Sequence, residues 1–307
     1  MGGRVSTKKI AVLLHEEDAS FETTNYLLRL MMEAWTAQGH AVEIVRGVGR
    51  FVPADVIIPH LDLTVTPHPY HDFMARYPVA VNGQVVDVSK SKISSNIVRK
   101  GDVYDGPVIV KTEWNYGGLP ESRLKMKVRP APSIPRRIIR KAACMLGVGR
   151  TGTTRWKFIE SMDSGSYPVF PSLREVPNEV FENKNLVVEK FLPEVEGGDY
   201  CLRYYYFFGD LEMNVLLKSR EKVVKGSNAF QCDEVPVPPE LRAIRRRMAF
   251  DYGKFDYVLR EGRVVLFDAN RTPSYSTLEA KQLARKAADR LAGGIHSILR
   301  SSSAGES

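Results

Sequence analysis

The stretch that decides the fold is FDYVLREGRVVLFDANRTP, residues 255–273. Two apolar runs flank a short turn that contains Gly262, a pattern typical of a β-hairpin with one face in a core. The hairpin nevertheless carries Asp256, Asp268 and Asn270, and Lys254 comes just before it. Because charged side chains are rare in such hairpins, this set predicts a functional site.

The register of the hairpin decides which side chains share a face. A two-residue turn at Glu261 and Gly262 would put Asp256 and Asp268 on opposite faces. We therefore predict a three-residue loop that begins at Arg260, with Gly262 in the left-handed conformation.

In that register Lys254 faces Asp268, and Asp256 faces Leu266. The polar face then consists of Lys254, Asp256, Asp268 and Asn270, at the open end of the hairpin. The opposite face is expected to be core and consists of Phe255, Tyr257, Leu259, Val265, Phe267 and Ala269. Two carboxylates and an amide oxygen without thiol or imidazole suit Mg²⁺ or Mn²⁺, with phosphate completing the shell. A structural salt bridge between Lys254 and Asp268 is the alternative.

The composition is ordinary for a soluble globular protein: 307 residues, 43% hydrophobic and 26% charged. That length allows two or three domains. The sequence has no transmembrane run, and its N-terminus does not have the pattern of a signal peptide. Three widely separated cysteines indicate reduced thiols, so a cytoplasmic protein is expected.

The positive charge is concentrated in one segment. Residues 123–157 hold eleven Lys and Arg and no acidic residue, whereas the whole chain has a net charge of +8. This basic tract predicts an anionic partner, for which nucleic acid, a polyphosphate and an acidic peptide all qualify. A solvated basic face is the alternative.

The N-terminal part predicts an open, partly parallel α/β domain. Strands are expected at 8–18, 41–47, 54–60 and 78–83. A helix is expected at 20–39, capped by Ser20 and ended by Gly39.

The remainder predicts mixed α+β structure. We expect a short helix at 89–100, a strand at 106–111, a helix at 135–147, and then a series of strands from 185 onward. Helices are expected at 238–253 and, as one final segment, at 274–295.

Two further segments have the chemistry of a nucleotide site. Lys111 ends the strand VIVK, and a loop with Gly117 and Gly118 follows, so charge and backbone N–H groups could cover phosphates. An ordinary Gly-Gly turn is the alternative. The strand NLVVEKFLP, residues 185–193, runs into a loop whose backbone groups could contact an adenine edge, or it is a simple hinge.

Taken together, residues 5–290 resemble the ATP-grasp superfamily of carboxylate–amine ligases, which includes D-alanine–D-alanine ligase, glutathione synthetase and the glutamate ligases. The most specific motif is GKFDYVLREGRVVLFDANRTP. The resemblance implies a three-domain ATP-grasp architecture: an N-terminal open α/β domain (1–84), a central lid domain with the basic insert (85–190) and a C-terminal domain with the Mg²⁺ site (191–307).

The resemblance also implies a role for each matching residue. Asp256, Asp268 and Asn270 would hold Mg²⁺ or Mn²⁺. Lys254 and Arg203 would act in catalysis. ATP would be bound by Lys111, Gly117 and Gly118, by Glu189, Lys190 and Leu192 at the adenine, and by Asp199 at the ribose. Another phosphate lysine would be Lys90 or Lys92.

The implied activity is an ATP-dependent ligase that forms an amide or peptide bond through an acyl phosphate and releases ADP and phosphate. A carboxylate and an amine would be substrates, one of them anionic or an acidic peptide. An ATP-grasp kinase is the first alternative, and a nucleic-acid-binding protein that uses the basic tract is the second. We expect no membrane partner and do not favour nucleic acid; a homo-oligomer fits the family. The spacing departs from the family's: about 20 residues separate the two phosphate lysines, and Ser274 replaces the usual glycine.

Overall fold

The computed structural model describes residues 7–128, 156–163, 167–275 and 278–303. The helix predicted at 135–147 and most of the basic tract lie outside these residues. The described chain forms two compact units: unit 1 consists of residues 1–95 and 192–307, and unit 2 of residues 96–191. Unit 2 is therefore a continuous segment inserted between the two halves of unit 1.

The first sheet lies in the N-terminal part of unit 1 and is parallel, with the order β2-β1-β3. Its strands are β1 (Lys9–Leu14), β2 (Ala41–Arg46) and β3 (Val56–His60). Helices α1 (Leu27–Ala37) and α2 (His68–Met74) belong to the same part. Nearly every residue of β1 and all of β3 are buried, as expected of parallel strands covered on both faces. The predicted α/β domain is confirmed.

Two details of this part differ from the prediction. The helix begins at Leu27, because residues 20–26 form turns in which Ser20 bonds to Asp18; Ser20 is therefore not its cap. The predicted strand at 78–83 contributes a single bridge between Ala80 and Ile57.

The second sheet is antiparallel and has the order β10-β9-β8-β11-β12, with β7 paired to β8. Its strands are β7 (Glu194–Glu196), β8 (Asp199–Phe208), β9 (Leu211–Ser219), β10 (Gln231–Glu234), β11 (Tyr252–Arg260) and β12 (Arg263–Asn270). Helices α3 (Lys90–Ile93), α7 (Pro239–Arg247), α8 (Leu278–Ala292) and α9 (Ile295–Ser303) also belong to unit 1.

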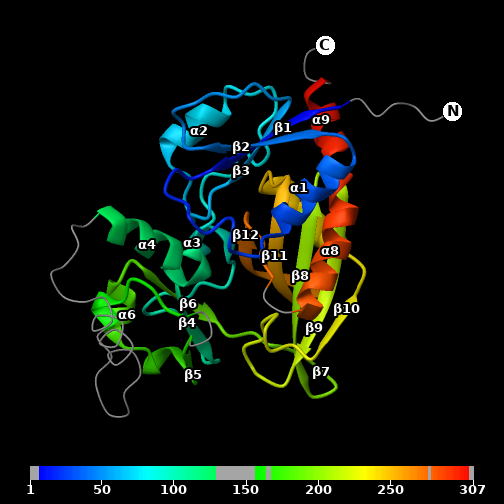
Figure 1. Cartoon of the computed structure of the whole chain (residues 1–307). Coiled ribbons are helices and arrows are strands. Elements are labelled where there is room, and N and C mark those ends of the chain that lie inside the picture. The colour runs from blue at the N-terminus through cyan, green and yellow to red at the C-terminus, as the bar shows by residue number, and fades with distance from the viewer. Residues whose placement is uncertain (1–6, 129–155, 164–166, 276–277, 304–307) are drawn as a thin grey trace. The chain divides into compact units, whose positions relative to one another are not determined.

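The two faces of this sheet pack into different cores. On one face Phe208, Met213 and Tyr252 join a core that includes residues of α1, α8 and the first sheet. Figure 1 shows α1 and α8 side by side next to this sheet. On the other face lies a second core, made with α7 and residues 85–93: Tyr205, Phe207, Phe255, Tyr257, Leu266 and Ala269. Alternate residues of β8 and β11 thus point to opposite faces.

The final helix predicted at 274–295 is α8, which ends before Gly293 and Gly294, and a further helix that was not predicted, α9, begins at Ile295. A Cβ atom on Gly294 would lie 2.0 Å from the carbonyl oxygen of Phe208. The close approach of the chain to the β8–β9 turn therefore requires glycine at this position.

Unit 2 contains the third sheet, which is antiparallel and has the order β5-β4-β6. It is formed by β4 (Val108–Thr112), β5 (Val169–Phe170) and β6 (Leu186–Lys190). The helices are α4 (Leu119–Val128) and α6 (Asn178–Glu182), with 3₁₀ turns at Asn115–Gly118, Trp156–Phe158 and Leu173–Glu175. Each of the three sheets falls within one of the three predicted segments, and the predicted boundaries at 84/85 and 190/191 remain predictions.

Candidate active site

The β11–β12 hairpin turns differently from the prediction. Glu261 and Gly262 both have positive φ angles, 52° and 77°, and Arg260 pairs with Arg263. The connection is therefore a two-residue turn, and the predicted three-residue loop is wrong. Paired left-handed residues match the right-handed twist of the flanking strands, which explains why this turn is preferred.

A register shift between Asp256 and Tyr257 nevertheless brings the polar residues together. Tyr257 pairs with Leu266, but Asp256 pairs with Asp268, so β12 has one additional residue, Phe267, at this point. The extra residue moves Asp268 to the position opposite Asp256, and Asn270 opposite Lys254. The four side chains share one face, as predicted, although the predicted partners are wrong.

The two-residue turn and the shift together change the core face of β12. The turn places Leu266 opposite Tyr257, and the shift places Ala269 opposite Phe255. Phe255, Tyr257 and Ala269 are fully buried as predicted, but Leu266 takes the buried position instead of its neighbours Val265 and Phe267. Side-chain direction alternates along a strand, and the extra residue interrupts that alternation.

Lys254 is paired with Asp256, not with Asp268 as the structural alternative required. Its Nζ lies 2.9 Å from Asp256 Oδ1 and 3.8 Å from the centroid of the Tyr204 ring. Burial acts to lower the pKa of Lys254, but the charge of Asp256, the hydrogen bond that Asp256 accepts from Lys254 and the charge of Asp268 outweigh it, and the pKa lies above its ordinary value. The side chain is thus held as a cation.

A second lysine reaches the same face from α3. Lys90 Nζ lies 3.7 Å from Asp268 Oδ1, and the Lys90 side chain is only 4% exposed. Lys92, two residues further along, is exposed. Of the two candidate lysines, the structure therefore brings Lys90 to the carboxylates.

Asn270 is fixed by its neighbours. Its Oδ1 accepts hydrogen bonds from the backbone N–H and the hydroxyl of Thr272, at 2.7 and 3.2 Å. The single hydrogen of the Thr272 hydroxyl is shared with Asp62 Oδ1, which is the nearer acceptor (2.8 Å), and the Tyr26 hydroxyl donates to Asp62 Oδ2 (3.1 Å). This network connects the end of β12 to the N-terminal sheet within unit 1.

The donor set fits a small divalent cation. Asp268 Oδ1 is buried and accepts no hydrogen bond from the described residues. Together with Asp256 and Asn270 it offers the hard oxygen ligands that Mg²⁺ and Mn²⁺ prefer. Within the described ranges, no group of three or more His, Cys, Asp and Glu has metal-binding geometry, so this set depends on the amide of Asn270 as its third member.

In unit 2 the predicted phosphate lysine is paired with a predicted adenine residue. Lys111 Nζ donates to Glu189 Oε2 at 2.6 Å across the β4–β6 pair, and Glu189 is completely buried. Lys190, the next residue, lies over the Tyr104 ring at 5.1 Å. The sequence suggested both Lys111 and Glu189 but gave no indication of this ion pair.

The loop after β4 needs its glycines. Tyr116, Gly117 and Gly118 have positive φ angles of 49°, 68° and 73°. A Cβ on Gly118 would lie 2.9 Å from the carbonyl oxygen of Glu160, and the Gly117 carbonyl accepts a hydrogen bond from Met162. Position 118 requires both a positive φ angle and close approach to the Glu160 carbonyl, and only glycine allows the two together.

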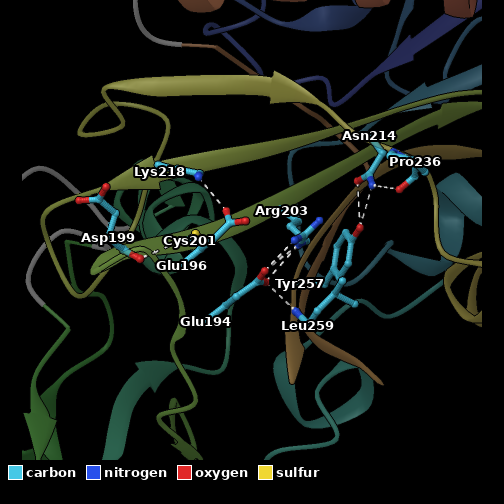
Figure 2. Close-up of polar contacts among 10 residues, drawn as sticks. All are labelled: Glu194, Glu196, Asp199, Cys201, Arg203, Asn214, Lys218, Pro236, Tyr257 and Leu259. Atoms are coloured by element: carbon cyan, nitrogen blue, oxygen red, sulfur yellow. Dashed lines mark hydrogen bonds and ion pairs between the residues drawn. The ribbon is translucent and has the colours of Figure 1, made fainter. Parts of the chain in front are cut away.

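Arg203 is not brought together with Lys254. On β8, Arg203 pairs with Tyr257, whereas Tyr204 pairs with Asp256, so Arg203 points to the opposite face of the sheet. Figure 2 shows its guanidinium directed at Glu194, with Tyr257 nearby. Glu194 accepts three hydrogen bonds from Arg203 (2.7–3.1 Å) and one from the Leu259 N–H (2.7 Å).

This half-buried ion pair connects three strands, β7, β8 and β11. Burial acts to lower the pKa of Arg203, but the bonds to Glu194 raise it above its ordinary value. Nothing in the sequence indicated Glu194 as the partner of Arg203, a contact that depends on the pairing of β7 with β8. Nor did the sequence indicate Tyr204 as a neighbour of Lys254, a contact that depends on the pairing of β8 with β11.

The last two predicted residues follow, in the sequence, the boundary at which unit 2 ends and the second part of unit 1 begins. Asp199 begins β8 and pairs with Glu196 across the turn Gly197–Gly198. Leu192 is half-buried and lies between β6 and β7. Their predicted roles at the ribose and adenine remain predictions.

Comparisons with known proteins identify the fold. No family model and no curated protein sequence matches the chain. Among solved structures, it is similar to D-alanine–D-alanine ligase from Bacillus anthracis, with 10% identity and a TM-score of 0.50 over 98% of this chain and all of that one. A RimK domain ATP-grasp protein from Sphaerobacter thermophilus matches 93% of this chain and 99% of its own, with 12% identity and a TM-score of 0.43.

The chain therefore has the fold of that D-alanine–D-alanine ligase, and the predicted ATP-grasp architecture is confirmed at the level of fold. The structure that establishes this is the D-alanine–D-alanine ligase, whose whole length is matched. In the part of the chain that the structure describes, no helix has the length and apolarity to cross a bilayer.

Proposed function

We propose that this protein is an ATP-dependent carboxylate–amine ligase that forms an amide or peptide bond. The observation that supports the proposal is the face of the β11–β12 hairpin, where two opposed carboxylates, Asn270 and two buried lysines meet on an ATP-grasp fold. This combination of oxygen ligands and fixed cations suits the triphosphate of a nucleotide.

Asp256, Asp268 and Asn270 would hold Mg²⁺ or Mn²⁺. Such a cation, when bound, neutralises charge on the phosphate oxygens and orients them. This chain's own residues would position the reacting groups and stabilise the charge that develops on them. No protein nucleophile is required, because the substrate carboxylate attacks the γ-phosphate of ATP and the amine then displaces phosphate from the acyl phosphate.

Of the residues in this site, Lys254 would lie closest to the reacting groups. Its ammonium is buried, charged and held by Asp256 and the Tyr204 ring. A cation so fixed can stabilise negative charge that develops on the transferred phosphoryl group without reorganising. Lys90 would contribute a second fixed charge.

In unit 2, Lys111 would bind phosphate and the Gly117–Gly118 loop would supply backbone N–H groups. Glu189, Lys190, Leu192 and Asp199 would bind the nucleoside. Arg203 is left out of this mechanism, because it points to the other face of the sheet.

An ATP-dependent kinase on the same fold is the second candidate. It shares the carboxylates and lysines and differs in its outcome, since phosphate stays on the product. The two candidates separate by the fate of the γ-phosphate.

The test is ADP release from Mg-ATP by the purified protein, measured against pools of carboxylates, amino acids and acidic peptides, with Asp268→Asn alongside. Pool-dependent ADP and free phosphate that disappear in the variant support the ligase. ADP with phosphate retained on product supports the kinase. Absence of ATP binding by the wild-type protein contradicts both.

A further inference from the structure

The carboxylates of the hairpin face already have cationic partners of their own. Asp256 has Lys254 at 2.9 Å, and Asp268 has Lys90 at 3.7 Å. The formal charges of these four groups sum to zero, and each lysine side chain is at most 13% exposed. Each carboxylate thus has an ammonium partner without a metal ion.

We propose that Lys90 and Lys254 are resident counter-ions that exclude a divalent cation from this face until nucleotide phosphates arrive. The inference rests on the proposed function and adds an order to it: metal and triphosphate enter together, and the metal does not bind alone. The two lysines then leave the carboxylates for the phosphates.

The physical argument concerns charge in a poorly solvated place. A divalent cation that entered alone would bring two positive charges to carboxylates that already have ammonium partners, within a few ångströms of those two ammonium groups. At such distances the repulsion is only weakly screened when the groups are buried. A triphosphate brings enough negative charge to accept both ammonium groups and leave both carboxylates to the metal.

The side chains are suited to such an exchange. A lysine carries a compact charge on a flexible stem, so a small movement of Nζ exchanges one anion for another. Asp256 and Asp268, in contrast, are fixed on opposed strands. The carboxylates therefore stay in place while their partners change.

The two lysines differ in how firmly they are held. Lys254 has the shorter ion pair and lies against the Tyr204 ring, whose hydroxyl accepts a hydrogen bond from the Gly226 N–H. Lys90 has the longer ion pair. We therefore expect removal of Lys254 to change metal binding more than removal of Lys90.

The experiment measures Mn²⁺ binding by electron paramagnetic resonance, with and without a non-hydrolysable ATP analogue. The proteins are wild type, Lys254→Met, Lys90→Met and, as control, Lys281→Met, an exposed lysine of α8. Wild type and control should bind Mn²⁺ roughly tenfold or more tightly with the analogue than alone. Lys254→Met should bind Mn²⁺ alone roughly tenfold more tightly than wild type, and Lys90→Met by a smaller factor.

Equal affinity of wild type and both lysine variants for Mn²⁺ alone overturns the inference. So does wild-type protein that binds Mn²⁺ equally well with and without the analogue. If Lys254→Met does not fold, the affinity of Lys90→Met for Mn²⁺ alone is compared with that of wild type: tighter binding supports the inference, and equal binding overturns it. Failure of the wild type to bind the analogue at any Mn²⁺ concentration would instead overturn the proposed function, so the two failures are distinguishable.

Discussion

Asp256 lies directly opposite Asp268 in the β11–β12 ladder, and each carboxylate is paired with a different buried lysine. Like charges placed opposite each other destabilise an isolated strand pair. Here the lysines offset that repulsion, and they come from two separate elements, β11 and α3. The arrangement makes each of the four groups dependent on the others.

Asp268→Asn should lower ADP release by about a hundredfold or more, because it removes one charged oxygen ligand from the proposed site. It should also destabilise the protein, since Lys90 loses its carboxylate. Breaking a fully buried pair costs about 3–5 kcal/mol, and less is expected here because Asp268 is 27% exposed. Urea unfolding measures this cost. Adding Lys90→Met should recover stability but not activity; recovered activity would contradict the assignment of Asp268.

Lys111→Ala should weaken ATP binding by about tenfold or more, as measured by calorimetry, because a fixed positive charge is lost. The variant also leaves Glu189 buried without its ammonium partner, so its folding must be checked. Lys184→Ala, which removes an exposed lysine of unit 2 that has no role in the proposed site, is the control for the loss of one positive charge. Unchanged ATP affinity in a folded Lys111→Ala protein would refute the phosphate-binding role of Lys111.

Arg203→Met should reduce stability by about 3–5 kcal/mol, because it leaves the Glu194 carboxylate buried and uncompensated. The same change should affect kcat little at temperatures where the variant is folded, since Arg203 faces away from Lys254. Glu194→Gln should have a similar pattern. A loss of kcat by a factor of about a hundred in folded Arg203→Met would show instead that the guanidinium acts in the chemistry.

His60 should make the protein sensitive to acid. It is completely buried between Phe21 and Tyr26, and burial lowers its pKa to about 3 from an ordinary value near 6.5. The unfolded chain therefore binds a proton below pH 6.5 that the folded chain does not bind until about pH 3. The stability due to neutral His60 is complete above pH 6.5 and is lost as the pH falls toward 3.

The check is the free energy of unfolding as a function of pH in wild type and His60→Leu. The difference between the two proteins should change between pH 6.5 and pH 4 in favour of the variant. A constant difference over this range would mean that other groups cause the acid sensitivity.

In the β11–β12 hairpin, the residues of the site could be predicted from the sequence, but the register could not. Residue types alone indicated that Asp256, Asp268 and Asn270 belong to one site, and the structure places them on one face. The register was wrong, because counting pairs outward from a turn assumes a continuous ladder. An additional residue at Phe267 is not recognisable from apolar and polar patterning, since Phe267 is itself apolar.

The contacts of the predicted phosphate lysines could not be predicted from the sequence. Lys90 and Lys92 are two positions apart on a helical turn and point in different directions, but nothing local says which direction faces the sheet. Lys111 and Glu189 are 78 residues apart, and their ion pair depends on the pairing of β4 with β6. Arg203 was predicted to act in catalysis because of a resemblance to a family motif. The pairing of β8 with β11 shows that its side chain lies on the other face of the sheet.

The core that joins α1, the first sheet and α8 has a consequence for synthesis on the ribosome. Trp35 Nε1 donates to the carbonyl oxygen of Ala292, and the Leu27 N–H donates to that of Pro273. The first 95 residues therefore leave the ribosome with an incomplete core and wait for the last part of the chain, while residues 96–191 have their partners within one continuous segment. During translation the inserted unit can fold first, and the N-terminal segment is the part that most needs protection from aggregation.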